Sequence, residues 1–126
     1  MVCRKCPTRF SVMALFLILG TKVFAIDVSE YQHHNLTQPG RDLMVFYVAG
    51  LSDAYRWANA DLVHKEEKPL YCFPPKLKVS VDFYQSIILD KIKEASTHAS
   101  AEELGTTDVA TVLLVGLQEA FPCPSK

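Results

Sequence analysis

Two cysteines, Cys72 and Cys123, constrain the fold of this chain more than any other feature of its sequence. Cys72 lies in a proline-rich stretch, YCFPP at 71–75, and Cys123 closes an amphipathic run of apolar residues. A disulfide between them would close a loop of about 50 residues and would stabilise a small fold by roughly 4 kcal/mol in the chain-entropy model. Two free thiols are the alternative, and the cellular compartment decides between the two states.

The first 25 residues have the parts of a secretory signal peptide. Basic residues within 4–9 precede an 11-residue apolar run, FSVMALFLILG at 10–20. Val23 and Ala25 are the small residues expected at −3 and −1 of a cleavage point. The run is roughly half of the ~20 apolar residues that span a bilayer. We therefore expect residues 1–25 to be removed on export, leaving one exported domain over 26–126.

Export also decides how the cysteines are interpreted. Cys3 and Cys6 form a Cys-x-x-Cys pair, which elsewhere would suggest redox chemistry or zinc. Both precede the apolar run and leave with the signal peptide. The oxidising compartment makes a disulfide the expected state of Cys72 and Cys123.

The charge of the exported chain limits its partners. Removal of the first 25 residues leaves 101, and the basic residues fall from 13 to 9 while all 14 acidic residues remain, so the net charge is −5. An acidic surface argues against nucleic-acid binding and favours a basic protein partner. We also expect no membrane span after signal cleavage, because no second segment is long and apolar enough.

Three segments, over 41–63, 81–95 and 107–120, have the periodicity of amphipathic helices. We expect Ser80 to cap the second segment and Thr106 or Thr107 to cap the third. Gly50 lies on the predicted buried face of the first, where a close approach of neighbouring backbone would explain it. The predicted buried faces comprise Leu43, Phe46, Tyr47, Gly50, Leu51, Ala54, Ala58 and Leu62, then Val81, Tyr84, Ile87, Ile88, Leu89, Ile92 and Ala95, then Val109, Val112, Leu113, Gly116, Leu117 and Ala120.

Shorter signals complete the predicted fold. Asp27-x-x-Glu30 predicts a short helix to about Asn35, and Pro39-Gly40 predicts a break. Residues 101–104 predict another short helical turn. Residues 64–79 contain three prolines, which exclude a long helix and predict a crossing loop. The sequence thus predicts an all-α fold, a small bundle of three main helices plus short ones, cross-linked by one disulfide.

Reactive residues do not group into a recognisable catalytic or metal-binding motif. His33 and His34 are adjacent, so they point to different sides of a helix and form a poor metal site. Cys72 could act as a nucleophile with His64 or His98 as its base, but only as a free thiol. We therefore expect no enzyme activity, no metal site and no cofactor.

Candidate partner-binding residues come from the loops and from the single tryptophan. Loops carry binding functions more often than core helices do, although charged turns are also simply solvated. Trp57 is predicted first to pack in the core, and its alternative role is an interface anchor. The candidate residues are Lys65, Glu66, Glu67, Lys68, Glu102, Glu103 and Trp57.

Four motifs resemble the Rap/Tai family of type VI secretion immunity proteins. YVAGLSDA at 47–54 resembles the family's G-Y-I-x-G-V-x-D-A helix, and CFP at 72–74 resembles its C-x-P loop. The segment 79–92, entered by Ser80 and carrying Gln85, is similar to the helix that follows. LQEAFPC at 117–123 resembles the terminal A-L-x-x-A-F-P-C.

This resemblance implies a non-catalytic, all-helical periplasmic protein, often a homodimer. Family members bind a peptidoglycan amidase toxin delivered by another cell and occlude its active cleft. The alternative hypothesis is a periplasmic chaperone or structural adaptor that binds other proteins. A small enzyme based on Cys72 is a third hypothesis.

Overall fold

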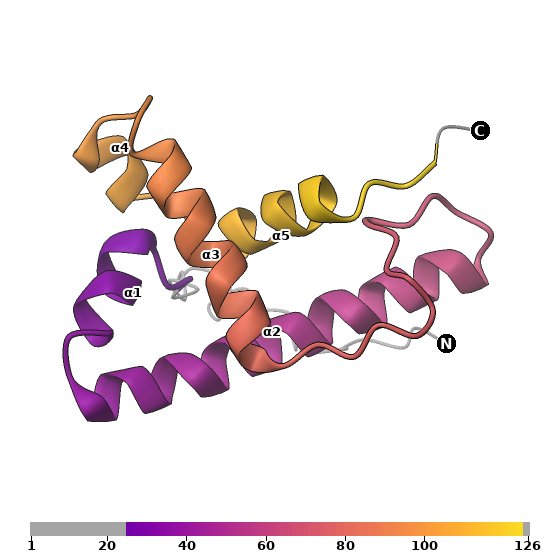
Figure 1. Cartoon of the computed structure of the whole chain (residues 1–126), viewed down its shortest axis with the longest axis horizontal. Helices are drawn as coiled ribbons and strands as arrows, with labels where there is room; N and C mark the ends of the chain where they lie inside the picture. The colour runs from indigo at the N-terminus through magenta and orange to yellow at the C-terminus, as the bar shows by residue number, and fades with distance from the viewer. Residues whose placement is uncertain (1–24, 125–126) are drawn as a thin grey trace, which may run out of the picture.

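The computed structural model describes residues 25–124, which form five helices (Figure 1). Within this range there is no strand, and an isolated bridge joins Asp27 to Asp108. The predicted all-α bundle of three main helices and additional short ones is confirmed. The helices are α1 (Val28–His34), α2 (Gln38–His64), α3 (Val81–Ala95), α4 (Ala101–Gly105) and α5 (Val109–Ala120).

The predicted signal peptide lies outside the described residues except for Ala25, and so do Cys3 and Cys6. None of the helices within residues 25–124 combines the length and the apolar character that crossing a membrane requires.

Helix α3 packs against both other long helices and so holds the molecule together. Figure 1 shows α2 running along the long axis, with α3 crossing it and α5 beside α3. The short helices α1 and α4 meet at one end of the molecule. The loop after α2 and the residues that follow α5, up to residue 124, lie at the other end.

The core forms where these helices cross. The predicted buried faces of α3 and α5 are largely confirmed, although Leu89 and Ala120 are exposed. Helix α1 contributes Val28 and Tyr31, and Tyr71 enters from the loop. The buried apolar residues are Val28, Tyr31, Met44, Val48, Tyr71, Tyr84, Ile88, Ile92, Val109, Val112, Leu113 and Leu117.

The buried face predicted for α2 is confirmed only in part: Tyr47 and Leu51 pack against the core, but several other predicted residues are exposed. Leu43 is 51% exposed and Phe46 is 76% exposed, whereas Met44 and Val48 are fully buried. Helix α2 has apolar residues at helical spacing on two faces, and the predicted face combined residues of both. Gly50 is therefore exposed, and a Cβ built on it meets nothing within 4 Å. The close backbone contact expected at Gly50 does not exist.

The break predicted at Pro39-Gly40 is also wrong, because both residues belong to the first turn of α2. Thr37 caps this turn, and its hydroxyl accepts from the Gly40 backbone N–H at 3.2 Å. Proline is tolerated there because the first helical N–H groups have no partner within the helix. A Cβ on Gly40 would overlap the His34 carbonyl oxygen, so glycine allows α1 to lead directly into α2.

The start of α5 is fixed by a contact with the beginning of the domain. Asp108, rather than Thr106 or Thr107, is the N-cap residue of α5. The Val28 N–H donates to the Thr107 carbonyl at 2.9 Å, and the Val109 N–H donates to the Ile26 carbonyl at 3.0 Å. These two backbone hydrogen bonds impose the local conformation that the threonines were expected to provide by capping.

Two glycines in helices are expected to respond in opposite ways to alanine. Gly50→Ala removes the helix penalty of glycine at an open site, so it should stabilise the fold by up to ~1 kcal/mol. Gly116→Ala places a methyl group against Ile87 Cγ2 and 3.0 Å from Lys91 Cγ. This overpacking should cost about 1–3 kcal/mol. Urea unfolding of the two variants checks the pair, and equal shifts of one sign would contradict it.

Alkaline pH is expected to unfold the protein through its tyrosines. Burial raises the pKa of all five, and that of Tyr71 to about 12. The unfolded chain loses these protons first, near pH ~10, so the contribution of the tyrosines to stability is fully present below that pH and is lost as pH rises above it. Phenolate absorbance during an alkaline titration measures the ionisation of the tyrosines, and circular dichroism measures the unfolding.

Tyr71→Phe should raise the midpoint pH of alkaline unfolding and preserve stability at neutral pH, because the Tyr71 hydroxyl has no hydrogen-bond partner within residues 25–124.

Candidate functional site

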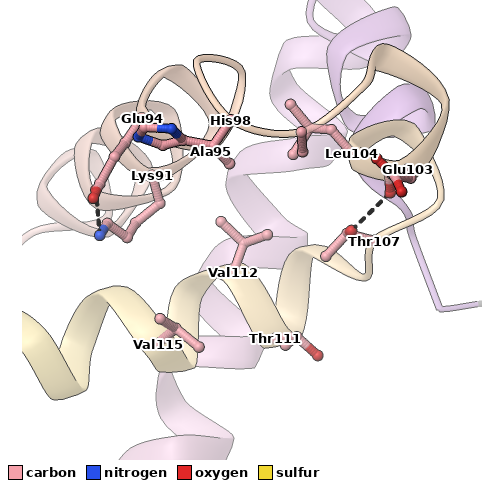
Figure 2. A pocket seen from close by; sticks show the side chains of 11 residues that line it. Lys91, Glu94, Ala95, His98, Glu103, Leu104, Thr107, Thr111, Val112 and Val115 are labelled. Carbon is pink, nitrogen blue, oxygen red and sulfur yellow. Dashed lines mark hydrogen bonds and ion pairs between the residues drawn. The ribbon is translucent and has the colours of Figure 1, made fainter.

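An open groove of about 560 Å³ lies between α3, α4 and α5 (Figure 2). Apolar side chains from all three elements form its floor, and Figure 2 shows Val112 projecting from α5 toward the centre. Val115, also on α5, is 41% exposed. The polar rim consists of Lys91, Glu94, His98, Glu103, Thr107 and Thr111, and the apolar lining consists of Ala95, Ala99, Leu104, Val112 and Val115.

The charge at the α3 edge of the groove is set by Lys91. Its ammonium group pairs with Glu119 on α5 and with Glu94 on α3. The hydrogen bonds that this ammonium group donates to the two carboxylates, that to Glu119 foremost, raise the pKa of Lys91, and the hydrogen bond to Glu94 lowers the pKa of the Glu94 carboxyl group. Two carboxylates share one ammonium group, so this edge carries a net negative charge.

Glu103, a predicted partner-binding residue, lines the opposite side of the groove but has a structural role. Ser100 and Glu103 form a capping box, in which the Glu103 carboxylate accepts from the Ser100 N–H at 3.1 Å. That backbone hydrogen bond lowers the pKa of Glu103. The Ser100-x-x-Glu103 spacing is the sequence signal for this box, although Glu103 was predicted only as a partner-binding residue. Glu102 is exposed and does not line the groove.

The crossing loop is anchored at its middle. Asn59 on α2 donates to the Tyr71 carbonyl at 2.9 Å and accepts from the Leu70 N–H at 2.6 Å. The Cys72 N–H donates to the Phe121 carbonyl at 2.9 Å. The Cys72–Cys123 disulfide is present, with 5.0 Å between the Cα atoms. Cys72 is therefore not available as a nucleophile.

A second cavity, of about 950 Å³, opens beside the disulfide. Three of the predicted loop residues, Glu66, Glu67 and Lys68, line it together with Val63, Pro69, Pro124 and both cysteines. Lys65 instead pairs with Asp61 on α2 at 2.6 Å. Both partners of this ion pair are exposed, so it contributes little stability.

Glu66 has the backbone conformation that usually requires glycine. Its φ is 58°, the positive φ of the left-handed region. The Glu67 N–H donates to the Leu62 carbonyl at 2.9 Å and the Glu66 N–H to the Val63 carbonyl at 3.1 Å. This pair of hydrogen bonds is the Schellman motif, which commonly places glycine at this position. The loop therefore leaves α2 in one defined direction.

The prediction that Trp57 packs in the core is wrong, since its side chain is 72% exposed. It lies on the outer side of α2, where Arg56 and Asp53 form an ion pair at 3.3 Å. Its alternative role as an interface anchor fits this position.

Five of the seven predicted residues thus occupy three separate places: Glu103 lines the groove, residues 66–68 line the disulfide cavity, and Trp57 lies on the outer side of α2. In Figure 1, α4 and the loop after α2 lie at opposite ends of the molecule, so the two charged segments do not form one site. Within residues 25–124, no three side chains of His, Cys, Asp or Glu come together in a way that could hold a metal ion. The arrangement presents open surfaces with apolar and charged side chains.

We expect Glu66→Gly to stabilise the fold by about 0.5–1 kcal/mol. The left-handed conformation costs a non-glycine residue roughly 1–2 kcal/mol, and the entropy of the glycine in the unfolded chain offsets part of this gain. Thermal or urea unfolding measures the change. Glu67→Gly is the matched control, because Glu67 lacks the positive φ; stabilisation by both substitutions would contradict the explanation.

Searches with the chain against protein-family models, curated proteins and solved structures give no match.

Proposed function

We propose that the protein is a periplasmic immunity protein that binds a peptidoglycan amidase toxin of type VI secretion and occludes its active cleft. The observation that carries this proposal is the groove between α3, α4 and α5, with its apolar floor and acidic rim. The resemblance of four sequence motifs to the Rap/Tai family supports a peptidoglycan amidase as the toxin that is bound. The expected signal peptide supports export of the chain, which a periplasmic location requires.

The groove has the composition of a protein-binding surface. Interfaces combine an apolar centre with a polar rim, and the floor at Val112 and Val115 is bordered by charged side chains. Because Lys91 is already paired with Glu94 and Glu119, the excess charge of the rim is negative. A partner that inserts an apolar side chain flanked by Lys or Arg would match both properties.

The scaffold around the groove is suited to blocking another protein. The disulfide, the Asn59 hydrogen bonds and the capping box hold the loop and α4 in place. A rigid surface loses little conformational entropy on binding, so more of the contact energy contributes to affinity.

A chaperone or adaptor is the second candidate, favoured by the exposed apolar side chains of α2. Phe46 and Trp57 are both about three-quarters exposed, and exposed apolar surface is what a chaperone presents to unfolded clients.

Substitution in the groove is expected to weaken toxin binding without unfolding the protein. Val115→Arg places a cation at the exposed edge of the apolar floor, and we expect the toxin dissociation constant to rise at least ~30-fold. Gln118→Arg is the matched control, because Gln118 is exposed on the same helix and does not line the groove. Calorimetry with a peptidoglycan amidase toxin of type VI secretion, and survival of cells exposed to toxin-delivering siblings, provide the two readouts.

Binding that is unchanged by Val115→Arg would show that the groove is not the toxin site. The immunity function itself would be excluded if cells lacking the protein were no more sensitive to their siblings than cells that carry it. Suppression of client aggregation at low pH, without toxin binding, would favour the chaperone.

A further inference from the structure

A separate pocket of about 360 Å³ lies where the start of α3 meets α2 and the loop that joins the two helices. In Figure 1 this place is at the end of α3 that is remote from α4. We call it the α2–α3 pocket, and none of its residues lines the groove between α3, α4 and α5. Its walls combine apolar side chains with the polar side chains of Ser52, Asp53, Arg56, Lys78 and Tyr84.

Tyr84 gives this pocket a hydrogen-bond donor that the protein does not use. Its side chain is 5% exposed, and its hydroxyl makes no hydrogen bond to another group within residues 25–124. The Tyr71 hydroxyl is also buried without a partner there. Burial raises the pKa of both tyrosines, and the positive charge of Arg56 opposes the rise in each. Buried polar groups without partners are rare, and here they occur within range of a guanidinium group.

Positive side chains outnumber negative ones around the pocket. Arg56 and Lys78 are cationic and Asp53 is anionic, so the lining carries a net charge of +1 on a chain that is acidic as a whole. Arg56 contacts Asp53 through one nitrogen atom, at 3.3 Å, which leaves the other N–H donors of its fork available. Lys78 is exposed and forms no ion pair within residues 25–124.

The start of α3 adds a further source of positive potential. Val79 and Val81, which flank the N-cap residue Ser80, both line the pocket. Ser80 makes no side-chain hydrogen bond to the first turn, so its hydroxyl does not cap the N–H groups of this 15-residue helix. Such N–H groups, together with the helix dipole, favour an anion nearby. Asp82 in the first turn offsets part of this potential, but it does not line the pocket.

We propose that the α2–α3 pocket binds a carboxylate that carries a short apolar group. The carboxylate accepts hydrogen bonds from Arg56, Lys78 and the Tyr84 hydroxyl, and the apolar group lies against Phe73 and Leu77, which also line the pocket. One negative charge matches the net charge of the lining, whereas a phosphate, with a charge near −2, would exceed it. A pocket near the lower end of the size range of ligand sites accepts a small acid or the last residue of a peptide.

Titration calorimetry and backbone NMR of the protein expressed from its whole sequence test this proposal. The probe is isovalerate, and the neutral isovaleramide is the control for charge. We expect isovalerate to bind with a dissociation constant on the order of 1 mM and to shift the backbone amide signals of Val81 and Asp82. Isovaleramide should bind at least ~10-fold more weakly. Equal binding of the two, or no binding of isovalerate far above the expected constant, would overturn the proposal.

A short peptide distinguishes the two sources of such a carboxylate. Acetyl-alanyl-leucine presents the carboxylate at the end of a chain, and acetyl-alanyl-leucinamide lacks its charge. Tighter binding of the peptide acid than of isovalerate would assign the pocket to the C-terminus of a polypeptide. Binding of isovalerate alone would assign it to a small acid. Equal affinity for the peptide acid and the peptide amide would refute recognition of a carboxylate.

Substitutions of the cations locate the bound carboxylate. Arg56→Gln and Lys78→Gln should each weaken isovalerate binding about 10-fold, because each removes a charged hydrogen-bond donor. Lys76→Gln is the matched control, since Lys76 is exposed two residues before Lys78 and does not line the pocket. Equal losses for Lys76→Gln and Lys78→Gln would show that the site is assigned wrongly.

Two further substitutions separate ligand binding from a loss of folding. Asp53→Asn should strengthen isovalerate binding about 3-fold, because the exposed ion pair no longer competes for Arg56; weaker binding would contradict the proposal. Tyr84→Phe should weaken binding about 5-fold, the contribution of one hydrogen bond, with an unchanged midpoint of urea unfolding. Val115→Arg, in the groove, should leave isovalerate binding unchanged, so this test is independent of toxin binding.

Discussion

Burial of one face of α3 between α2 and α5 is the interaction on which the rest of this structure depends. Tyr84, Ile88 and Ile92 lie on that face, and Gly116 of α5 lets α3 come close at Ile87 and Lys91. The same close approach brings the ammonium group of Lys91 to Glu119 of the other helix. The charge at the edge of the groove is therefore a direct result of how the core packs.

The helices that could be predicted best from the sequence are those with one apolar face. In α3 and α5 the apolar residues repeat at spacings of 3 and 4 on a single side, so periodicity identified nearly all of the buried positions. The loop over 64–79 was equally clear, because three prolines exclude a helix. The disulfide was predicted from the expected oxidising compartment and from the two cysteines that remain after signal cleavage, and the structure contains it.

Helix α2 was not predictable in the same way, because it is apolar on two sides. Periodicity finds a face but does not say whether the protein's own core covers it, and Met44 and Val48 are buried only because α1 and α3 pack there. Trp57 was misplaced for the same reason. The role of Glu103 was missed because its acidity was considered without Ser100 three residues earlier. The positions of the candidate residues relative to one another depend on long-range packing, which spacing along the chain does not encode.

The Cys72–Cys123 bond also changes the connectivity of the chain. It closes residues 72–123 into a covalent ring that contains α3, α4 and α5. Helices α1 and α2 belong to the linear part of the chain that precedes the ring. A protease that cuts once inside the ring, for example in the turn between α3 and α4, opens it without releasing a fragment. A single cut between α2 and Cys72 instead divides the molecule into two pieces. The ring thus keeps the part of the domain that forms the groove in one piece after a single cut.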